Sequence, residues 1–190
     1  MHTQLVVLGG GPGGYAAAFL AADRGLQVTL VEAEPQLGGT CLLRGCIPSK
    51  ALLHVAHVIA EAADLSAEWG VSFAPPRIDI DLLRQRKQKL VDTLSGGLGQ
   101  LAKRRGVRVI RARGVLDSAT SLRLEQCQDP DIQEPSVTFD QLILSTGSIP
   151  TSLPALRSVS PRVLNSTSAL ELPTVPESLL VIGGGYIGLE

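Results

Sequence analysis

The sequence predicts an α/β protein built around a parallel sheet, and three observations lead to this class. Residues 5–8 form an apolar run that leads directly into a glycine-rich turn at residues 9–14. An alanine-rich helix at residues 15–23 and a second apolar strand at residues 27–32 follow. An apolar run and a glycine-rich turn occur again at residues 179–188. The order strand, turn, helix and strand is typical of nucleotide-binding α/β units.

The first turn carries the spacing Gly-x-Gly-x-x-Gly. In such a turn Gly9 permits the tight bend, Gly11 lets the backbone approach a pyrophosphate, and Gly14 lets the helix pack against the strand. The phosphates would meet the N-terminus of the helix. Glu32 ends the second strand 18 residues after Gly14, where a carboxylate accepts ribose hydroxyls. Glycine-rich turns are common. A turn with a strand before it, a helix after it and an acid at the end of the next strand predicts a dinucleotide site.

The middle of the chain is expected to hold two long helices and several short strands. The helices are expected at residues 49–63 and 81–105, the second bent or broken near the glycines at 96–99. Antiparallel strands are predicted at 107–112, around Leu116, at 122–124 and at 137–139. A further buried strand starts at residue 142 and ends in the small residues Thr146, Gly147 and Ser148. Such a turn lets backbone lie close to a ligand.

Two cysteines, Cys41 and Cys46, lie five residues apart before the first long helix. Five residues of regular helix rise about 7.5 Å, whereas a disulfide needs Cα atoms within about 4.4–6.8 Å. The pair can therefore bridge only across irregular backbone, which Gly45 favours. Pro48 suits a first helical turn, so Cys46 would lie at a helix N-terminus, where the dipole favours a thiolate.

This arrangement indicates a labile, redox-active pair rather than a structural disulfide. Two alternatives are a pair of unlinked thiols and half of a metal site. Metal ligands usually come in sets of three or four at other spacings, and no His or Cys neighbours these two. Cys127 has no evident mate.

Composition limits the classes of partner. The chain has 190 residues, 44% hydrophobic, which allows one substantial core and the start of a second. A net charge of −1 gives no reason to expect a nucleic-acid partner. The N-terminus lacks the basic region of a signal peptide, and no run is long enough to span a membrane, so we expect no membrane partner and a cytoplasmic protein.

The expected organisation is a nucleotide-binding domain, a linker and the beginning of a second domain. Residues 1–148 would form the first domain, and residues 149–178, rich in Pro and Ser, a linker or crossover. Residues 179–190 repeat the opening unit, with Gly183, Gly185 and Gly188 in its turn. The sequence stops before the helix and second strand of that second unit.

With these motifs in order, the chain resembles the class I pyridine nucleotide–disulfide oxidoreductases over essentially all 190 residues. The landmarks are residues 9–14, the box from Cys41 to Lys50, residues 145–148 and residues 183–190. Members of this family are more than twice as long, so the chain would be an N-terminal portion. The resemblance implies a Rossmann-like, FAD-binding, three-layer β/β/α domain, followed by the first strand of a second Rossmann domain that binds NAD.

The resemblance also implies roles for individual residues. Cys41 would exchange with the substrate, Cys46 would face the flavin, and Lys50 would lie near flavin N5, paired with Glu190. It implies no metal. The residues it assigns to FAD are Gly9, Gly11, Pro12, Gly13, Gly14, Glu32, Gly39, Thr40, Lys50, Gly114, Thr146, Gly147 and Ser148. Those it assigns to the start of the NAD site are Gly183, Gly185, Gly188 and Glu190.

The reaction implied by the resemblance is ping-pong. Dihydrolipoamide would reduce the Cys41–Cys46 disulfide, electrons would pass through FAD, and a hydride would leave to NAD⁺. The lipoyl group would belong to a 2-oxo acid dehydrogenase or to a glycine-cleavage carrier, and the family is homodimeric. The acid/base His–Glu pair of the family does not correspond to His2, His54 or His57.

Two other functions remain open. One is a related disulfide reductase that acts on glutathione or mercuric ion, because substrate selection lies largely in parts of the family that this sequence does not contain. The other is a non-catalytic FAD-binding fragment. We expect little turnover from this chain alone, and poor solubility if the apolar strand at residues 179–182 is exposed.

Overall fold

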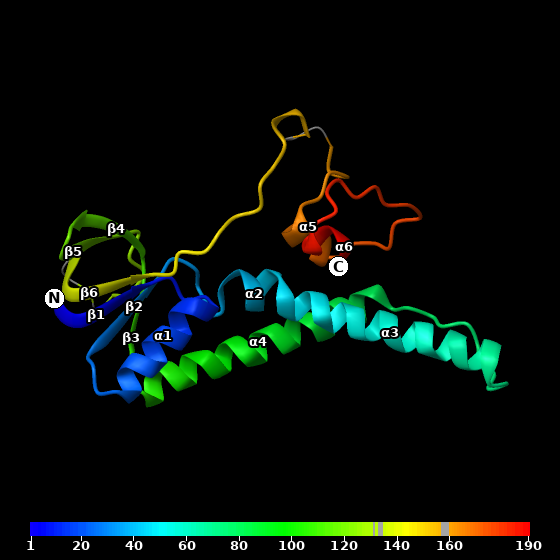
Figure 1. The fold of residues 1–190 in the computed structure, drawn as a ribbon, viewed down its shortest axis with the longest axis horizontal. Coiled ribbons are helices and arrows are strands. Elements are labelled where there is room, and N and C mark those ends of the chain that lie inside the picture. The colour runs from blue at the N-terminus through cyan, green and yellow to red at the C-terminus, as the bar shows by residue number, and fades with distance from the viewer. Residues whose placement is uncertain (131, 133–134, 157–159) are drawn as a thin grey trace. The chain divides into compact units, whose positions relative to one another are not determined.

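The computed structural model describes residues 1–130, 132, 135–156 and 160–190, and its contacts divide the chain into two units. Unit 1 comprises Met1–Leu43 and Asp92–Ser148. Unit 2 comprises Arg44–Val91 and Ile149–Glu190. Two helices, α2 (Gly39–Arg44) and α4 (Ile80–Arg104), run through the boundaries between the units (Figure 1).

Unit 1 contains one six-stranded sheet in the order β3-β2-β1-β6-β5-β4. Strands β1, β2, β3 and β6 pair in parallel, whereas β5 pairs antiparallel with both β4 and β6. Strand β6 belongs to both the parallel and the antiparallel part of the sheet, because Thr138 pairs with His2 of β1 and with Ser121 of β5. The strands are β1 (His2–Leu8), β2 (Val28–Glu32), β3 (Arg108–Arg111), β4 (Arg113–Ser118), β5 (Ser121–Glu125) and β6 (Ser136–Leu144).

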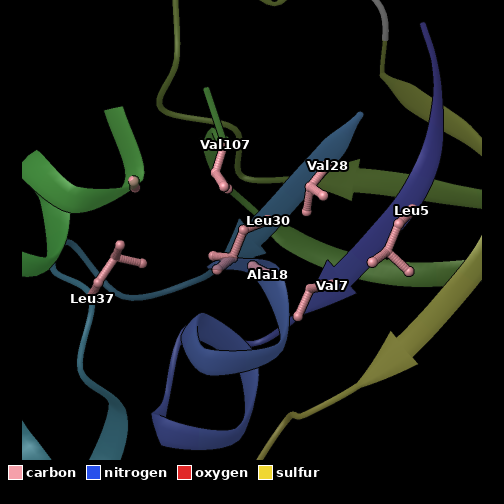
Figure 2. Close-up of a cluster of buried hydrophobic side chains, with 8 residues drawn as sticks. Leu5, Val7, Ala18, Val28, Leu30, Leu37 and Val107 are labelled. Carbon is pink, nitrogen blue, oxygen red and sulfur yellow. The ribbon is translucent and has the colours of Figure 1, made fainter. Parts of the chain in front are cut away.

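The parallel part of the sheet is buried on both faces, because side chains alternate along a strand. On one face, Leu5 and Val7 of β1 pack with Ala18 of α1 (Pro12–Asp23) and with Ala102 of α4 (Figure 2). On the other face, Val6 packs in a cluster with residues of the antiparallel strands, namely Leu122, Leu124, Val137 and Phe139. Helices, parallel sheet and antiparallel strands therefore form the three layers that the family resemblance implied.

The opening unit has the predicted order β1-α1-β2, but α1 begins inside the predicted turn, before the expected start at residue 15. Helix α1 begins with Pro12 and ends at Asp23, with Arg24 as its C-cap. Gly25 follows with φ +87°, a left-handed conformation that glycine adopts most easily after a helix. Strand β2 then pairs with β1 and ends at Glu32, at the same end of the sheet as the glycine-rich turn.

Three predictions about the middle of the chain were wrong. Strand β3 is parallel to β2, because the long helix α4 precedes it and brings the chain back in the same direction. Residues 137–139 and 142–144 belong to a single strand, since β5 and β1 pair with successive parts of β6. The expected break at the glycines 96–99 does not occur, because helix α4 is continuous there, and its last buried residue, Ala102, anchors it on the sheet.

The predicted first strand of the second Rossmann domain does not form. Residues 179–182 carry no strand assignment, and their side chains are exposed, Leu180 by 85%. A strand needs a neighbour with which to pair, and every strand of the described chain lies in unit 1. The apolar run alone therefore does not specify a strand.

Unit 2 is helical. Helix α3 (Cys46–Glu68) extends beyond the predicted residues 49–63 at both ends. Within the predicted linker, Pro154–Leu156 forms a 3₁₀ turn and Ser166–Leu170 forms helix α5, with Asn165 as its N-cap. The buried Lys87 of α4 donates a hydrogen bond to the carbonyl of Leu170, with Nζ and O 2.5 Å apart. Helix α6 (Tyr186–Leu189) follows the second glycine-rich turn.

Among the described residues, the helices are all too short or too polar to cross a membrane.

Candidate functional site

The glycine-rich turn after β1 requires glycine at two positions. Gly9 has φ +105°, and a Cβ there would overlap the carbonyl oxygen of Ser145. A Cβ at Gly14 would overlap the carbonyl oxygen of Gly9. The Gly9 amide donates to the carbonyl of Val31 at 2.8 Å, and the Ser145 amide donates to that of Leu8 at 2.8 Å. Strands β1, β2 and β6 thus hold the turn in one conformation.

Helix α1 presents its N-terminus beside this turn. Gly11 is the N-cap residue, and no side chain caps the helix. The first amides of a helix have no partners within the helix, so they can donate to phosphate oxygens. Cβ atoms at Gly11 and Gly13 would meet their nearest neighbours at 3.6 Å, which is an ordinary van der Waals contact. This geometry fits a dinucleotide pyrophosphate.

Glu32 has a role in the turn that sequence reasoning missed. Glu32 is 8% exposed. Oε2 accepts a hydrogen bond from the Gly10 amide at 2.6 Å, and Oε1 accepts one from the Glu34 amide at 2.8 Å. Each carboxylate oxygen has a second lone pair, so the same group can still accept ribose hydroxyls. In the sequence, the position of Glu32 at the end of a predicted strand was the only indication of this role.

A cavity of about 440 Å³ adjoins Glu32. The loop after β2 forms one side, α4 forms another, and the end of β3 completes it. Its walls comprise Glu32, Glu34, Pro35, Gln36, Leu37, Asp92, Ser95, Gly96, Gly99, Val109 and Arg111.

The segment that leads into α2 lies against the glycine-rich turn. The Gly38 amide donates to the carbonyl of Gly10 at 2.9 Å. Gly39 has φ +58°, and a Cβ there would lie 2.6 Å from the Cα atom of Gly11. Gly39 and Gly11, both predicted for FAD, are therefore neighbours. Thr40 follows as an exposed residue of α2.

The other predicted FAD residues of unit 1 lie on β4 and after β6. Gly114 is packed on β4, where a Cβ would lie 2.6 Å from Cδ1 of Leu8. Thr146, Gly147 and Ser148 are exposed residues beyond the end of β6, and Gly147 has φ +72°.

The two predicted redox cysteines lie in different units. Cys41 is a half-buried residue of α2 in unit 1. Cys46 is an exposed thiol in unit 2 and is the first residue of α3, after the N-cap residue Gly45. Lys50 follows Cys46 by four residues, so both side chains lie on the same side of the helix.

Lys50 and Glu190 form an ion pair within unit 2. Lys50 Nζ lies 2.6 Å from Glu190 Oε1, and the hydroxyl of Ser49 donates to the same oxygen at 2.5 Å. The hydrogen bonds from Lys50 and then Ser49 lower the pKa of Glu190 below its usual value. The start of α3 therefore carries a thiol and a cation that is paired with a carboxylate.

The second glycine-rich turn has the same geometry as the first. Gly183 has φ +115°, Gly185 is the N-cap of α6, and a Cβ at Gly188 would overlap the carbonyl oxygen of Gly183. Gly9, Gly11 and Gly14 occupy the corresponding positions of the first turn. Of the residues predicted for NAD, Gly183 and Gly185 are exposed residues of this turn, Gly188 is a half-buried residue of α6, and Glu190 follows that helix.

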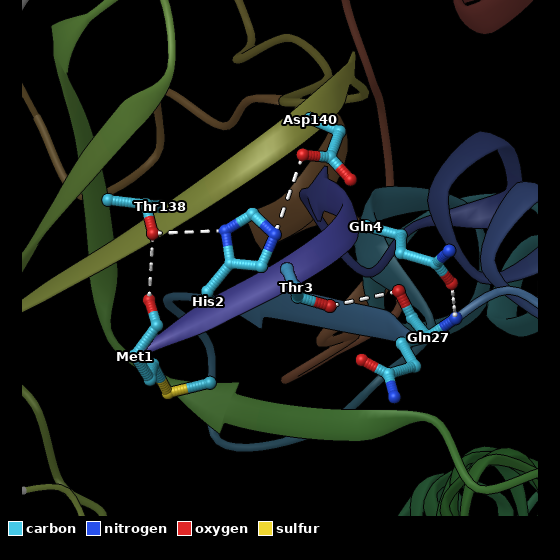
Figure 3. A network of polar contacts seen from close by, with 7 residues as sticks. All are labelled: Met1, His2, Thr3, Gln4, Gln27, Thr138 and Asp140. Atoms are coloured by element: carbon cyan, nitrogen blue, oxygen red, sulfur yellow. Dashed lines mark hydrogen bonds and ion pairs between the residues drawn. The ribbon is translucent and has the colours of Figure 1, made fainter.

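A polar network on β1 and β6 lies at the strand ends remote from the turn, and sequence reasoning missed it (Figure 3). His2 Nδ1 lies 3.2 Å from Thr138 Oγ1, and His2 Nε2 lies 3.4 Å from Asp140 Oδ1. Both His2 and Asp140 are more than half exposed, which makes the network a surface link between strands. In the described part of the chain, no three His, Cys, Asp or Glu side chains are grouped so that they could bind a metal ion.

Comparison with known proteins identifies the class. The family model for pyridine nucleotide-disulphide oxidoreductases matches residues 3–190, and the chain belongs to this family. It is 49% identical to a dihydrolipoyl dehydrogenase of Vibrio parahaemolyticus and 47% identical to one of Haemophilus influenzae, over 100% of this chain and 39% of each relative. It is 40% identical to a leghemoglobin reductase of Glycine max, over 100% of this chain and 36% of that protein. The chain thus spans about two fifths of the length of these relatives.

Proposed function

We propose that this chain is the N-terminal part of a flavin-dependent dihydrolipoyl dehydrogenase, which oxidises dihydrolipoyl groups and reduces NAD⁺. The observation that carries this proposal is the start of α3, where Cys46 is exposed, Lys50 follows one turn later, and Lys50 is paired with Glu190. The relatives named dihydrolipoyl dehydrogenase support the choice of substrate.

Cys41 and Cys46 would carry the disulfide exchange. A substrate thiolate attacks Cys41 Sγ and releases Cys46 as a thiolate, and the second substrate thiol then displaces Cys41. The substrate dithiol becomes a disulfide, and the cysteine disulfide becomes two thiols. Cys46 is the first residue of α3, and Lys50 follows one helical turn later.

The first glycine-rich turn would hold FAD. The amides at the start of α1 would bind the pyrophosphate, Glu32 would accept the adenosine ribose hydroxyls, and Gly39, Thr40 and Lys50 would lie along the flavin end. Gly114 would lie on the adenine side, with residues 146–148 close to the cofactor. FAD, when bound, supplies the two-electron exchange between a dithiol and a nicotinamide.

The second turn, with Gly183, Gly185 and Gly188, would begin the NAD site. The lipoyl group would be carried by a 2-oxo acid dehydrogenase or by a glycine-cleavage carrier. We also propose that the complete protein is a cytoplasmic homodimer, and that residues 1–148, 149–178 and 179–190 are its FAD domain, a crossover and the start of its NAD domain.

The test is an absorbance titration of the purified protein with dihydrolipoamide. We expect a bound flavin spectrum that gains a long-wavelength band after one two-electron equivalent, together with two new titratable thiols per chain. Cys46→Ser should abolish the band and the new thiols, whereas Cys127→Ser, an exposed cysteine of unit 1, should change neither. A colourless protein, or reduction by NADPH and reoxidation by glutathione disulfide without any response to dihydrolipoamide, would contradict the proposal.

A further inference from the structure

We infer that Ser95 is a positioning residue for FAD binding, because its hydroxyl fixes the position of the loop that packs against the glycine-rich turn. This inference rests on the proposed FAD site and assigns a role to a residue on α4, outside the turn and outside the cysteine box. All the contacts involved lie within unit 1.

Ser95 is a buried polar residue that faces the loop after β2. The residue is 5% exposed, and its hydroxyl donates to the carbonyl of Leu37 at 2.7 Å. Leu37 lies between β2 and α2, outside any helix or strand. The Ser95 hydroxyl therefore ties this loop to α4.

Residues 37–39 each contact the glycine-rich turn, so the position of the loop affects the position of the turn. A Cβ at Gly10 would lie 2.7 Å from Cδ2 of Leu37, so the Leu37 side chain packs directly on Gly10. The Gly38 amide bonds to the Gly10 carbonyl, and Gly39 lies against Gly11. A shift of Leu37 would consequently move the backbone that borders the N-terminus of α1.

A merely structural hydroxyl provides the matched control. Thr3 of β1 is 3% exposed, and its hydroxyl donates to the carbonyl of Gln27 at 2.9 Å (Figure 3). This bond also ties a loop carbonyl to a buried hydroxyl, but it lies at the start of β1, whereas the turn follows the end of that strand. Loss of either hydroxyl should lower stability by a similar amount.

The experiment measures FAD affinity of the apo form of the full chain by quenching of flavin fluorescence. We compare the wild type with Ser95→Ala, Ser95→Thr and Thr3→Val. A lost buried hydrogen bond corresponds to about a threefold to tenfold change in an equilibrium constant, so Ser95→Ala should bind FAD about threefold to tenfold more weakly. Ser95→Thr should restore the affinity, and Thr3→Val should leave it within about twofold of the wild type.

Amide exchange in the apo protein gives a second readout. Ser95→Ala should accelerate exchange at Gly38, whose amide bonds to Gly10, and Thr3→Val should not. If Ser95→Ala does not fold, Ser95→Cys, with a weaker donor, should show an intermediate affinity. Wild-type FAD binding that Ser95→Ala or Ser95→Cys leaves unchanged would overturn the inference alone. A wild type that binds no FAD would instead overturn the proposed function.

Discussion

Glu32 and Glu190 are two carboxylates that receive different kinds of hydrogen bond. Glu32 accepts hydrogen bonds from the backbone amides of Gly10 and Glu34, and a side-chain substitution does not remove these donors. Glu190 accepts from Lys50 and Ser49, whose side chains can be replaced. The place of Glu32 at a strand end could be found in the sequence, whereas the pairing of Glu190 with Lys50 was implied only by the family resemblance.

The first prediction concerns the titration of Glu190. Lys50→Met should raise the pKa of Glu190 toward its usual value, because the hydrogen bond from Lys50 is the largest cause of the lowered value. Ser49→Ala should raise the pKa by a smaller amount. Carbon NMR of the labelled side-chain carboxyl as a function of pH measures both changes, with Lys103→Met in unit 1 as the control variant.

The sign of the pH dependence follows from that direction. Since the pKa of Glu190 is lower in the folded state, the ion pair contributes stability above the usual glutamate value of about 4.3. That contribution is lost as the pH falls through the lowered folded value. An unchanged Glu190 titration in Lys50→Met would show that the ion pair does not persist in solution.

At the scale of elements, the two glycine-rich turns show what a short motif determines. Both turns have a first glycine with positive φ and a third glycine against the first carbonyl. Only the first is joined to a sheet, because β1 pairs with two neighbours whereas residues 179–182 form no strand. The turn is thus a local structure, and the strand before it requires partners.

The second prediction compares two adjacent glycines of α1. Gly14→Ala should destabilise unit 1 by about 2 kcal/mol or more, because its Cβ would overlap the Gly9 carbonyl oxygen. Gly13→Ala should be neutral, or stabilising by up to about 1 kcal/mol, since its Cβ meets only Ser145 Oγ at 3.6 Å. Urea denaturation followed by far-UV circular dichroism measures both. Equal stability of the two variants would contradict the role assigned to Gly14.

At the scale of the whole molecule, the buried hydrophobic clusters distinguish the two units. Unit 1 contains both hydrophobic clusters of buried residues. Unit 2 exposes the apolar run at residues 179–182, with Leu179 at 68% and Leu180 at 85%. Exposed apolar runs of this kind favour association with other chains.

The third prediction concerns solubility of this 190-residue chain. Leu180→Lys should increase the fraction of soluble monomer, because it places a charge in the exposed apolar run. Leu53→Lys on α3, where the leucine is 42% exposed, is the control and should have a smaller effect. Size-exclusion chromatography measures the monomer fraction. A wild-type chain that is already a soluble monomer and unfolds in one cooperative step would argue against this expectation.

The sequence by itself determined the features that depend on neighbouring residues. These are the β1-α1-β2 unit, the glycine-rich turn, Glu32 at the end of β2 and Cys46 at the start of α3, all of which follow from local dihedral preferences and from bonds within one turn or strand. Tertiary structure alone decided the parallel direction of β3, the single strand β6 and the lack of a strand at residues 179–182. It also brought Ser95 to Leu37, 58 residues away along the chain. Those features depend on which distant segments pack together, and no local pattern specifies that choice.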